Sequence, residues 1–368
     1  MKVLILSLTV GVGHNACAKS LMKGLEERSI ECEVLDTYGY INPLLRESVD
    51  KAYLLSTSYS PLIYSQVYRM AEKRNPSDKK LISMHRMTQG LFSKKLGSYI
   101  DDYNPDVIVC THIFAAQIVT EIKNIRAKSI GIVTDFTIHP FWEDTKLDYY
   151  VTAHELLNNQ FARKNLPVEK CLPMGIPIDQ KFTVKLSKAE ARRKLCLADK
   201  LTVLVMGGSM GFGNMDSMIK RLDKLDMDFQ IVTICGNNKR LKRKIDHLRT
   251  NKILYNYGFV NNVDLFMDAS DCICTKPGGL TVSEALAKTL PIIMPTAIPG
   301  QEERNMEFLQ NNGIGMRSSS TFKIDECMYQ FLTAYDKRKN IYQESIKYIA
   351  KPNSTSDLVD FILSLQRA

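Results

Sequence analysis

The sequence predicts an α/β protein with two parallel β-sheets, each covered by helices. Short apolar runs alternate with helical patterns over most of the 368 residues, and this alternation is typical of parallel strands joined by crossover helices. Two glycine turns stand in equivalent places, because each follows the first strand of one series, at residues 10–14 and 207–211. The length is sufficient for two domains of ordinary size. We therefore expect two units, each with a parallel sheet covered by helices.

Each expected strand is a short apolar run bounded by turn residues or helical patterns. The first series comprises residues 2–8, 32–36, 106–111, 129–134 and 148–152. The second series comprises residues 202–206, 229–235, 253–257, 271–275 and 291–295. The segment from Met174 to Asp179 is the expected crossover. We therefore predict domains 1–175 and 176–368, and leave open whether the last helix packs back on the first domain.

The composition indicates a soluble globular protein, since 45% of the residues are hydrophobic and 24% are charged. The formal net charge of +9 favours an anionic partner, such as nucleic acid, an anionic membrane surface or a phosphorylated substrate. No apolar run has the length that spans a bilayer, and residues 3–8 lead into Gly11 and Gly13, which favours a first strand over a signal sequence. The nine cysteines form no C-x-x-C pair, which indicates reduced thiols in a cytosolic protein.

Residues 40–97 interrupt the alternation of strands and helices. They combine several tyrosines, including Tyr64 and Tyr68, with an excess of basic residues such as Arg69. Basic, aromatic, partly amphipathic stretches bind anionic membrane surfaces. A set of ordinary helices with a solvated basic face is the alternative, and the basic run at 239–244 fits that alternative better than a binding surface.

The segment Lys276-Pro-Gly-Gly-Leu-Thr-Val-Ser-Glu-Ala285 is the most informative motif of the chain. It follows an expected buried strand and opens a helical pattern, so backbone N–H groups and a helix dipole converge at the turn. Two adjacent glycines let a phosphate approach the backbone closely. We therefore predict a phosphate or diphosphate site. Because Thr281-x-x-Glu284 is also a capping-box pattern, a purely structural role for both residues stays open.

His14 lies in a turn that fits the G-x-G-x-x-A dinucleotide fingerprint at residues 11–16, and Asp36 ends the next expected strand. This pattern makes a nicotinamide or flavin enzyme a serious alternative. A histidine would crowd a pyrophosphate at this position, however, whereas an imidazole at the mouth of a parallel sheet suits proton transfer. A helix-capping role for His14 is the structural alternative.

Polar residues also follow two other expected strands. Asp135 and His139 fall at a carboxyl end, where open α/β sheets bind ligands. Trp142, the only tryptophan, is either a lipid-facing anchor or part of the core. Gln301 and Glu302 offer donors and acceptors to sugar hydroxyls, or else form the polar first turn of a helix.

Two other site types lack their sequence patterns. The glycine turn at 207–213 is not followed by the Lys-Ser or Lys-Thr of a P-loop, although it still offers N–H groups to an anion. His154-Glu155 lacks the second histidine of H-E-x-x-H, and nothing in the sequence is typical of a zinc cluster. We therefore predict no metal site.

In combination, these motifs resemble diacylglycerol glycosyltransferases of the monogalactosyldiacylglycerol synthase and processive diacylglycerol glucosyltransferase type. These enzymes belong to glycosyltransferase family 28 and are related to the lipid II-forming N-acetylglucosaminyltransferase. The residues that carry the resemblance are Gly11 to His14, Val133 to Phe136 with His139 and Trp142, Gly175 to Ile178, Gly258 to Val260, Thr275 to Thr281 and Pro299 to Glu302. The resemblance implies a GT-B fold, in which two doubly wound, Rossmann-like domains face a cleft. It also implies inverting transfer of a hexose from a UDP-sugar, which is a co-substrate, with no cofactor and no essential metal.

By this resemblance the C-terminal domain would bind the donor and the N-terminal domain the lipid acceptor. Phe259 and Val260 would border the uracil, the two glycine turns would hold the diphosphate, and Glu284 would accept hydrogen bonds from the ribose. The expected donor-binding residues are Gly208, Ser209, Gly236, Phe259, Val260, Lys276, Pro277, Gly278, Gly279, Thr281, Glu284, Gln301 and Glu302. The expected acceptor and membrane contacts are Gly11, Gly13, Tyr64, Tyr68, Arg69, His139 and Trp142.

The resemblance makes His14 the expected catalytic base, with Asp135 as its partner or as an alternative base. The expected partners are UDP-glucose or UDP-galactose, diacylglycerol and an anionic membrane surface, and no nucleic acid. The expected location is peripheral, at the cytoplasmic face of the cell membrane. Transfer to a polyprenyl-diphosphate-linked sugar, a dinucleotide-dependent oxidoreductase and a catalytically silent UDP-sugar sensor remain alternatives. Residues 9–12 and 111–114 are less polar than the family pattern, which leaves the acceptor open.

Overall fold

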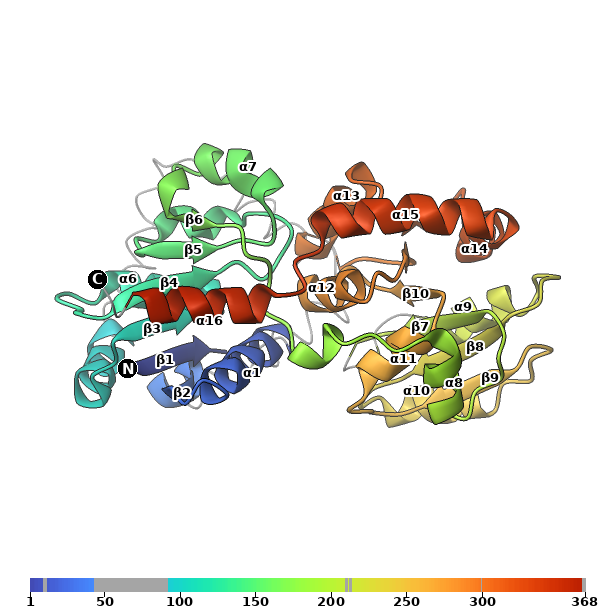
Figure 1. Ribbon diagram of the computed structural model, residues 1–368, viewed down its shortest axis with the longest axis horizontal. Coiled ribbons are helices and arrows are strands. Elements are labelled where there is room, and N and C mark those ends of the chain that lie inside the picture. The colour runs from blue at the N-terminus through green and yellow to red at the C-terminus, as the bar shows by residue number, and fades with distance from the viewer. Residues whose placement is uncertain (9–11, 43–91, 209–210, 212–213, 299, 366–368) are drawn as a thin grey trace. The chain divides into compact units, whose positions relative to one another are not determined.

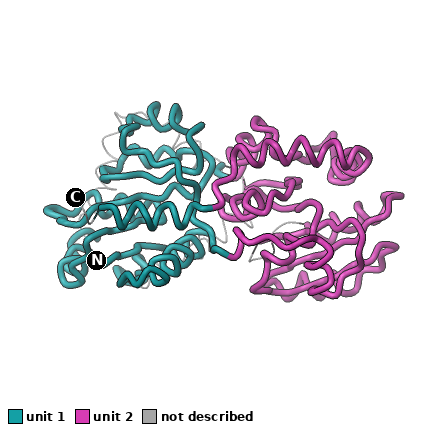
Figure 2. The backbone as a smooth tube through the Cα atoms, in the orientation of Figure 1, with its two compact units in different colours: residues 1–180, 299–301, 353–368 teal, residues 181–298, 302–352 magenta. Residues whose placement is uncertain are grey.

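The structure is a computed structural model that describes residues 1–8, 12–42, 92–208, 211, 214–298 and 300–365. The chain divides into two compact units (Figure 2). Unit 1 comprises residues 1–180, 299–301 and 353–368, and unit 2 comprises residues 181–298 and 302–352. Each unit has its own sheet.

In the residues described, unit 1 holds a six-stranded parallel sheet (Figure 1). Its strands are β1 (Lys2–Ser7), β2 (Glu31–Asp36), β3 (Val107–Cys110), β4 (Lys128–Ile132), β5 (Tyr149–Val151) and β6 (Cys171–Leu172). Their order is β2-β1-β3-β4-β5-β6. The direction of winding reverses between β1 and β3, so the carboxyl ends of these two strands frame the crevice where open α/β sheets bind ligands. The core lies on β1 and β3, whose apolar side chains are buried.

Helices and short 3₁₀ turns connect the strands of unit 1. They are α1 (Val12–Glu26), α2 (Thr37–Ile41), a helical segment at residues 92–103, α6 (Ile113–Glu121), η1 (Pro140–Asp144), η2 (Glu155–Leu157), α7 (Asn158–Arg163) and η3 (Val168–Lys170). The last helix of the chain, α16 (Ser354–Ser364), packs against α1 (Figure 1). The Thr355 hydroxyl donates to the Ile178 carbonyl at 2.6 Å. Gly24 permits this packing, because a Cβ there would lie 2.9 Å from the Thr355 methyl group.

Unit 2 repeats the architecture, again with a six-stranded parallel sheet in the residues described. Its strands are β7 (Thr202–Met206), β8 (Gln230–Ile234), β9 (Leu254–Tyr257), β10 (Cys272–Thr275), β11 (Ile292–Met294) and β12 (Gly315–Arg317). Their order is β12-β11-β10-β7-β8-β9, so the winding reverses between β7 and β10. The carboxyl ends of β7 and β10 therefore frame the second expected ligand crevice.

The helices of unit 2 connect its strands in sequence order and then extend beyond β12. They are η4 (Gln180–Phe182), which starts at the last residue of unit 1, α8 (Lys188–Lys194), α9 (Met215–Leu222), α10 (Lys239–Asp246), α11 (Val263–Ala269), α12 (Gly279–Ala287), α13 (Gln301–Asn311), α14 (Ile324–Thr333) and α15 (Tyr335–Ile349). At the amino end of β10, the buried Asp271 carboxylate accepts from Arg192 at 2.7 Å and from the Thr202 backbone N–H at 2.7 Å. Lys188 and Tyr335 also donate to it. This cluster joins α8, β7, β10 and α15.

All ten predicted strands are present, with ends that differ by at most a few residues. The two strands that the sequence did not predict, β6 and β12, are only two and three residues long. The nine cysteines are all free. Within the described part of the chain, we find no helix with the length and apolar character needed to cross a membrane.

Candidate active site

At the carboxyl ends of the strands of unit 1, His14 lies in the first turn of α1, shortly after β1. Its Nδ1 atom lies 2.8 Å from the Thr111 carbonyl oxygen at the end of β3. The same Nδ1 lies 3.0 Å from the Thr134 hydroxyl, which follows β4. The carboxyl ends of three neighbouring strands thus meet at one imidazole, as the parallel sheet requires.

The contact with Thr111 determines which nitrogen of His14 carries the proton. A carbonyl oxygen can only accept a hydrogen bond, so Nδ1 must be the protonated nitrogen and donate to it. The neutral ring then has its lone pair at Nε2. Burial lowers the pKa of His14, and the hydrogen bond to Thr111 offsets part of this effect. His14 is therefore a neutral imidazole with a basic Nε2 at neutral pH.

His112 lies beside His14, and the sequence did not predict it as a site residue. The two rings meet edge to face, with centroids 4.4 Å apart. His112 is the N-cap of α6, where its Nδ1 accepts from the Phe114 backbone N–H at 3.1 Å. The available signal was its position, because His112 follows β3 at the carboxyl end in the same way that His14 follows β1.

Asp135 is also close to this edge of the sheet, three residues after the end of β4. Its side chain is buried, with 9% exposure. The Gln301 side-chain amide, in the same unit, donates to the Asp135 carboxylate. The structure thus brings together the predicted partner or alternative base, Asp135, and a predicted sugar-binding amide.

The prediction that Trp142 faces a membrane is wrong in this structure. Its indole is only 4% exposed and packs edge to face on Tyr150, with ring centroids 6.1 Å apart. The cause is Gly131 on β4: a Cβ there would lie 2.8 Å from the indole and 2.7 Å from Leu147. The missing side chain leaves space for the indole in the core. Nearby, His139 caps η1 and its Nδ1 accepts from the Phe141 N–H at 3.1 Å.

The crevice of unit 2 contains the Lys276-Pro-Gly-Gly motif, directly after β10. α12 starts at Gly279 with Gly278 as its N-cap, and no described side chain caps it. Thr281 therefore lies in the third helical position and Glu284 lies within the helix, so the capping-box interpretation is wrong. The first N–H groups of a helix have no intrahelical acceptor. Donors of this kind at the start of a helix can bind an anion.

Two interactions hold this turn in shape. The Lys276 ammonium lies 2.6 Å from Glu302, whose second carboxylate oxygen accepts from the Ile298 N–H at 2.8 Å. The buried Asn305 amide donates to the Pro277 carbonyl at 3.0 Å. Lys276 therefore reaches the crevice as part of an ion pair, and the predicted sugar-binding Glu302 is its partner.

The neighbouring strands of unit 2 place the remaining described donor residues at the same edge. Gly208, after β7, has a positive φ of 70°, and a Cβ there would lie 3.5 Å from the Lys276 side chain. Gly236, after β8, also has a positive φ of 57°. Phe259, after β9, exposes 60% of its surface, and Val260 follows it. An exposed aromatic ring at this edge is suited to stacking on a base.

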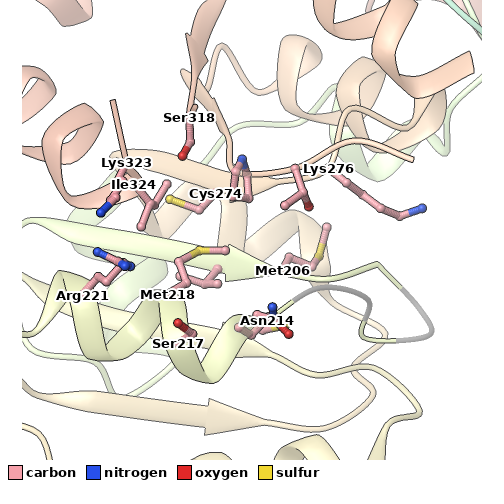
Figure 3. Close-up of a pocket in the computed structure, with 14 residues that line it drawn as sticks. Met206, Asn214, Ser217, Met218, Arg221, Cys274, Lys276, Ser318, Lys323 and Ile324 are labelled. Carbon is pink, nitrogen blue, oxygen red and sulfur yellow. The ribbon is translucent and has the colours of Figure 1, made fainter. Parts of the chain in front are cut away.

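A hollow of about 180 Å³ lies between the sheet of unit 2 and helices α9 and α14. Figure 3 shows Arg221 and Lys323 on one side of it and the Lys276 side chain extending away from it. Among the residues that line the hollow, the sequence predicted only Lys276 as a site residue. Met206 at the end of β7, Cys274 on β10 and Lys276 line the hollow, so it lies at the carboxyl ends of these two strands.

Several predicted residues fall outside the described part of the chain. They are Gly11, Tyr64, Tyr68, Arg69 and Ser209. Gly13 is described, and lies in the first turn of α1 beside His14. Among the residues that the structure describes, no group of three histidine, cysteine or acidic side chains is arranged to hold a metal ion.

Comparison with known proteins adds to this geometry. Residues 14–178 match the family described as monogalactosyldiacylglycerol (MGDG) synthase, and residues 202–357 match the glycosyltransferase family 28 C-terminal domain. A processive diacylglycerol beta-glucosyltransferase of Bacillus mycoides (strain KBAB4) is 29% identical over 378 residues, covering 100% of this chain and 94% of the relative.

Solved structures are similar in fold at low sequence identity. MurG of Acinetobacter baumannii has a TM-score of 0.61 at 14% identity and covers 99% of each chain. Anabaena Alr3699/HepE in complex with UDP has a TM-score of 0.56 at 14% identity, covering 99% of this chain and 100% of that chain. The predicted GT-B class of fold is confirmed. The first match includes β2 to β6 of unit 1, and the second includes all six described strands of unit 2. The chain belongs to glycosyltransferase family 28, with an N-terminal domain of the MGDG synthase type.

Proposed function

We propose that this enzyme transfers a hexose from UDP-glucose or UDP-galactose to the hydroxyl of diacylglycerol or of a glycosyl-diacylglycerol, with inversion at the anomeric carbon. The reaction would need no cofactor and no essential metal. It would take place at an anionic membrane surface, on the cytoplasmic face of the cell membrane. Family membership and the name of the Bacillus relative support the acceptor and the reaction class.

The observation that carries the proposal is the 2.8 Å contact between His14 Nδ1 and the Thr111 carbonyl oxygen, from which the tautomer of His14 follows. Its Nδ1–H donates to the Thr111 carbonyl, and its lone pair is therefore at Nε2. A neutral imidazole with a fixed orientation is what a general base for an alcohol requires. The oxidoreductase alternative has no comparable support, since the chain belongs to a glycosyltransferase family.

The proposed reaction is a single displacement. The acceptor O–H gives its proton to His14 Nε2 while its oxygen forms a bond to C1 of the hexose. The bond between C1 and the β-phosphate oxygen breaks, and UDP leaves with the electron pair. Attack on the face opposite the leaving group inverts C1, so an α-linked UDP-hexose gives a β-glycoside. Asp135 is the alternative base, and its contact with the Gln301 amide favours a role beside the sugar instead.

Unit 2 would bind the donor through backbone groups and Lys276. The N–H groups at the start of α12 and the turn that begins at Gly208 would hold the diphosphate. Donors that are already in place stabilise the charge that develops on the departing UDP without reorganising. Phe259 would contact the uracil, and Glu284 the ribose. Because Glu302 already pairs with Lys276, the backbone would supply much of the attraction for the diphosphate.

The test is a donor and acceptor screen with the full chain. UDP-glucose and UDP-galactose are each incubated with liposomes that contain diacylglycerol and an anionic phospholipid, with and without EDTA. We expect a hexosyl-diacylglycerol by mass spectrometry, a β-anomeric proton coupling by NMR, and no loss of rate in EDTA. Transfer only to a polyprenyl-diphosphate-linked sugar would overturn the acceptor, and an α-anomer would overturn the inverting mechanism. Binding of UDP-sugar with no transfer to any acceptor would favour a sensor.

A further inference from the structure

The four histidines that the structure describes in unit 1 form two different patterns of hydrogen bonds through Nδ1. His112, His139 and His154 each cap a helical turn and accept, through Nδ1, from the backbone N–H two residues later, at 3.1, 3.1 and 3.2 Å. Their Nδ1 atoms therefore carry the lone pair, and in the neutral ring the proton is on Nε2. His14 has the reverse arrangement, with the proton on Nδ1.

The segment at residues 111–114 contacts His14 through the Thr111 carbonyl and also contains His112. The Thr111 carbonyl that orients His14 belongs to the residue directly before His112. The cap contact between His112 and the Phe114 N–H fixes the turn at residues 111–114. The His112 ring also packs edge to face on the His14 ring. His112 therefore restricts the orientation of the His14 ring both by direct contact and through the backbone of residues 111–114.

We propose that His112 is a positioning residue, which holds His14 in the orientation and tautomer that leave Nε2 basic. This inference rests on the proposed function, in which His14 accepts the proton of the acceptor. It assigns His112 no contact with the substrate. A protonated Nδ1 on His112 would break the cap of α6, so the cap also keeps this ring neutral.

The groups around His112 are compatible with a neutral ring. Burial lowers the pKa of His112 most, and His14 on α1 and His139 at the start of η1 lower it further. On α2, Tyr38 stacks on Phe114, with ring centroids 6.2 Å apart. A proton taken from the acceptor would therefore reside on His14, since a second charge on His112 would be repelled.

Two substitutions separate the ring of His112 from its cap. Asparagine is a strong N-cap residue, so His112→Asn keeps the cap and removes the ring, whereas His112→Ala removes both. We expect kcat to fall on the order of tenfold for His112→Asn and further for His112→Ala, because small misplacements of catalytic groups are costly. The KM for the UDP-sugar should stay unchanged. His154→Asn is the matched control, since it makes the same exchange at another cap and should keep the full rate.

The second readout is NMR of ¹⁵N-labelled histidine, which reports the tautomer and pKa of His14 without any activity. In His112→Asn we expect water to reach His14, its pKa to rise toward the ordinary value, and its Nδ1-protonated tautomer to lose dominance. An unchanged kcat, or a lower kcat with an unchanged His14 spectrum, would overturn the inference. Failure of the proposed function has a different signature, because the unsubstituted enzyme would then transfer no hexose to diacylglycerol.

Discussion

The two units share a topology but differ in what they place at the same point of it. Both sheets reverse their winding between two central strands, β1 and β3 in unit 1 and β10 and β7 in unit 2. Unit 1 places imidazoles there, and unit 2 places glycine turns, an open helix end and a lysine–glutamate pair. An imidazole changes charge near neutral pH, whereas backbone N–H groups do not. The sheet therefore determines where a site lies, and the loop residues determine its chemistry.

The strongest test of this division is His14→Ala. If unit 1 supplies the base, kcat should fall by a factor on the order of 10²–10⁴, the usual contribution of general base catalysis. UDP binding, measured by calorimetry, should stay unchanged, because the proposed nucleotide site lies in unit 2. His247→Ala is the control, since His247 is an exposed histidine at the end of α10. An equal loss of UDP affinity and rate in His14→Ala would contradict the division.

Asp271→Ala, at the opposite end of the sheet of unit 2, should lower the free energy of unfolding. The change leaves Arg192 buried without its partner at 2.7 Å, and breaking a buried ion pair costs about 3–5 kcal/mol. Guanidinium unfolding followed by circular dichroism measures the loss. Asp199→Ala removes the other, 74% exposed partner of Arg192 and should cost at most about 1 kcal/mol. Equal losses in the two variants would show that the buried cluster has no special role.

In the crevice of unit 2, Lys276→Ala should weaken UDP binding by about tenfold, the equivalent of roughly 1.4 kcal/mol and typical of one charge-assisted hydrogen bond. The substitution also leaves the Glu302 carboxylate without its lysine near the diphosphate. Adding Glu302→Gln should therefore restore part of the affinity. A double variant that binds UDP no better than Lys276→Ala would show that Glu302 does not oppose the diphosphate.

A smaller effect is expected in the pH dependence of the rate, which should differ from that of an enzyme whose base is an ordinary imidazole. Burial lowers the pKa of His14 below its usual 6.5, and the base works only when neutral. The rate should therefore persist at pH 6.5, where an unperturbed imidazole would have lost about half of its neutral form, and fall only at lower pH. A profile of kcat/KM against pH measures this acid limb. A midpoint at or above pH 6.5 would contradict the described environment of His14.

Sequence patterns predicted the strands better than the site. Buried apolar runs marked ten strands, but β12 has half-exposed residues and no apolar run to mark it. His14 was identified by its glycine turn, whereas His112 was missed because its importance depends on a contact with a residue far away in the chain. Trp142 was assigned to a membrane surface because no pattern shows that Gly131 leaves space for an indole. The tautomer of His14 and the space for the Trp142 indole both depend on tertiary contacts, which the spacing of residues along the chain does not reveal.

The smallest expected effect concerns Trp142, and it separates the core of unit 1 from any membrane contact. Because the only tryptophan is 4% exposed, its emission should already be that of an apolar environment. Anionic liposomes should then leave the emission maximum unchanged, even when sedimentation shows that the protein is bound. A blue shift on binding would mean that the indole leaves its place beside Gly131. Gly131→Ala is the matched variant, since the added methyl group should displace the indole and shift the emission without any lipid.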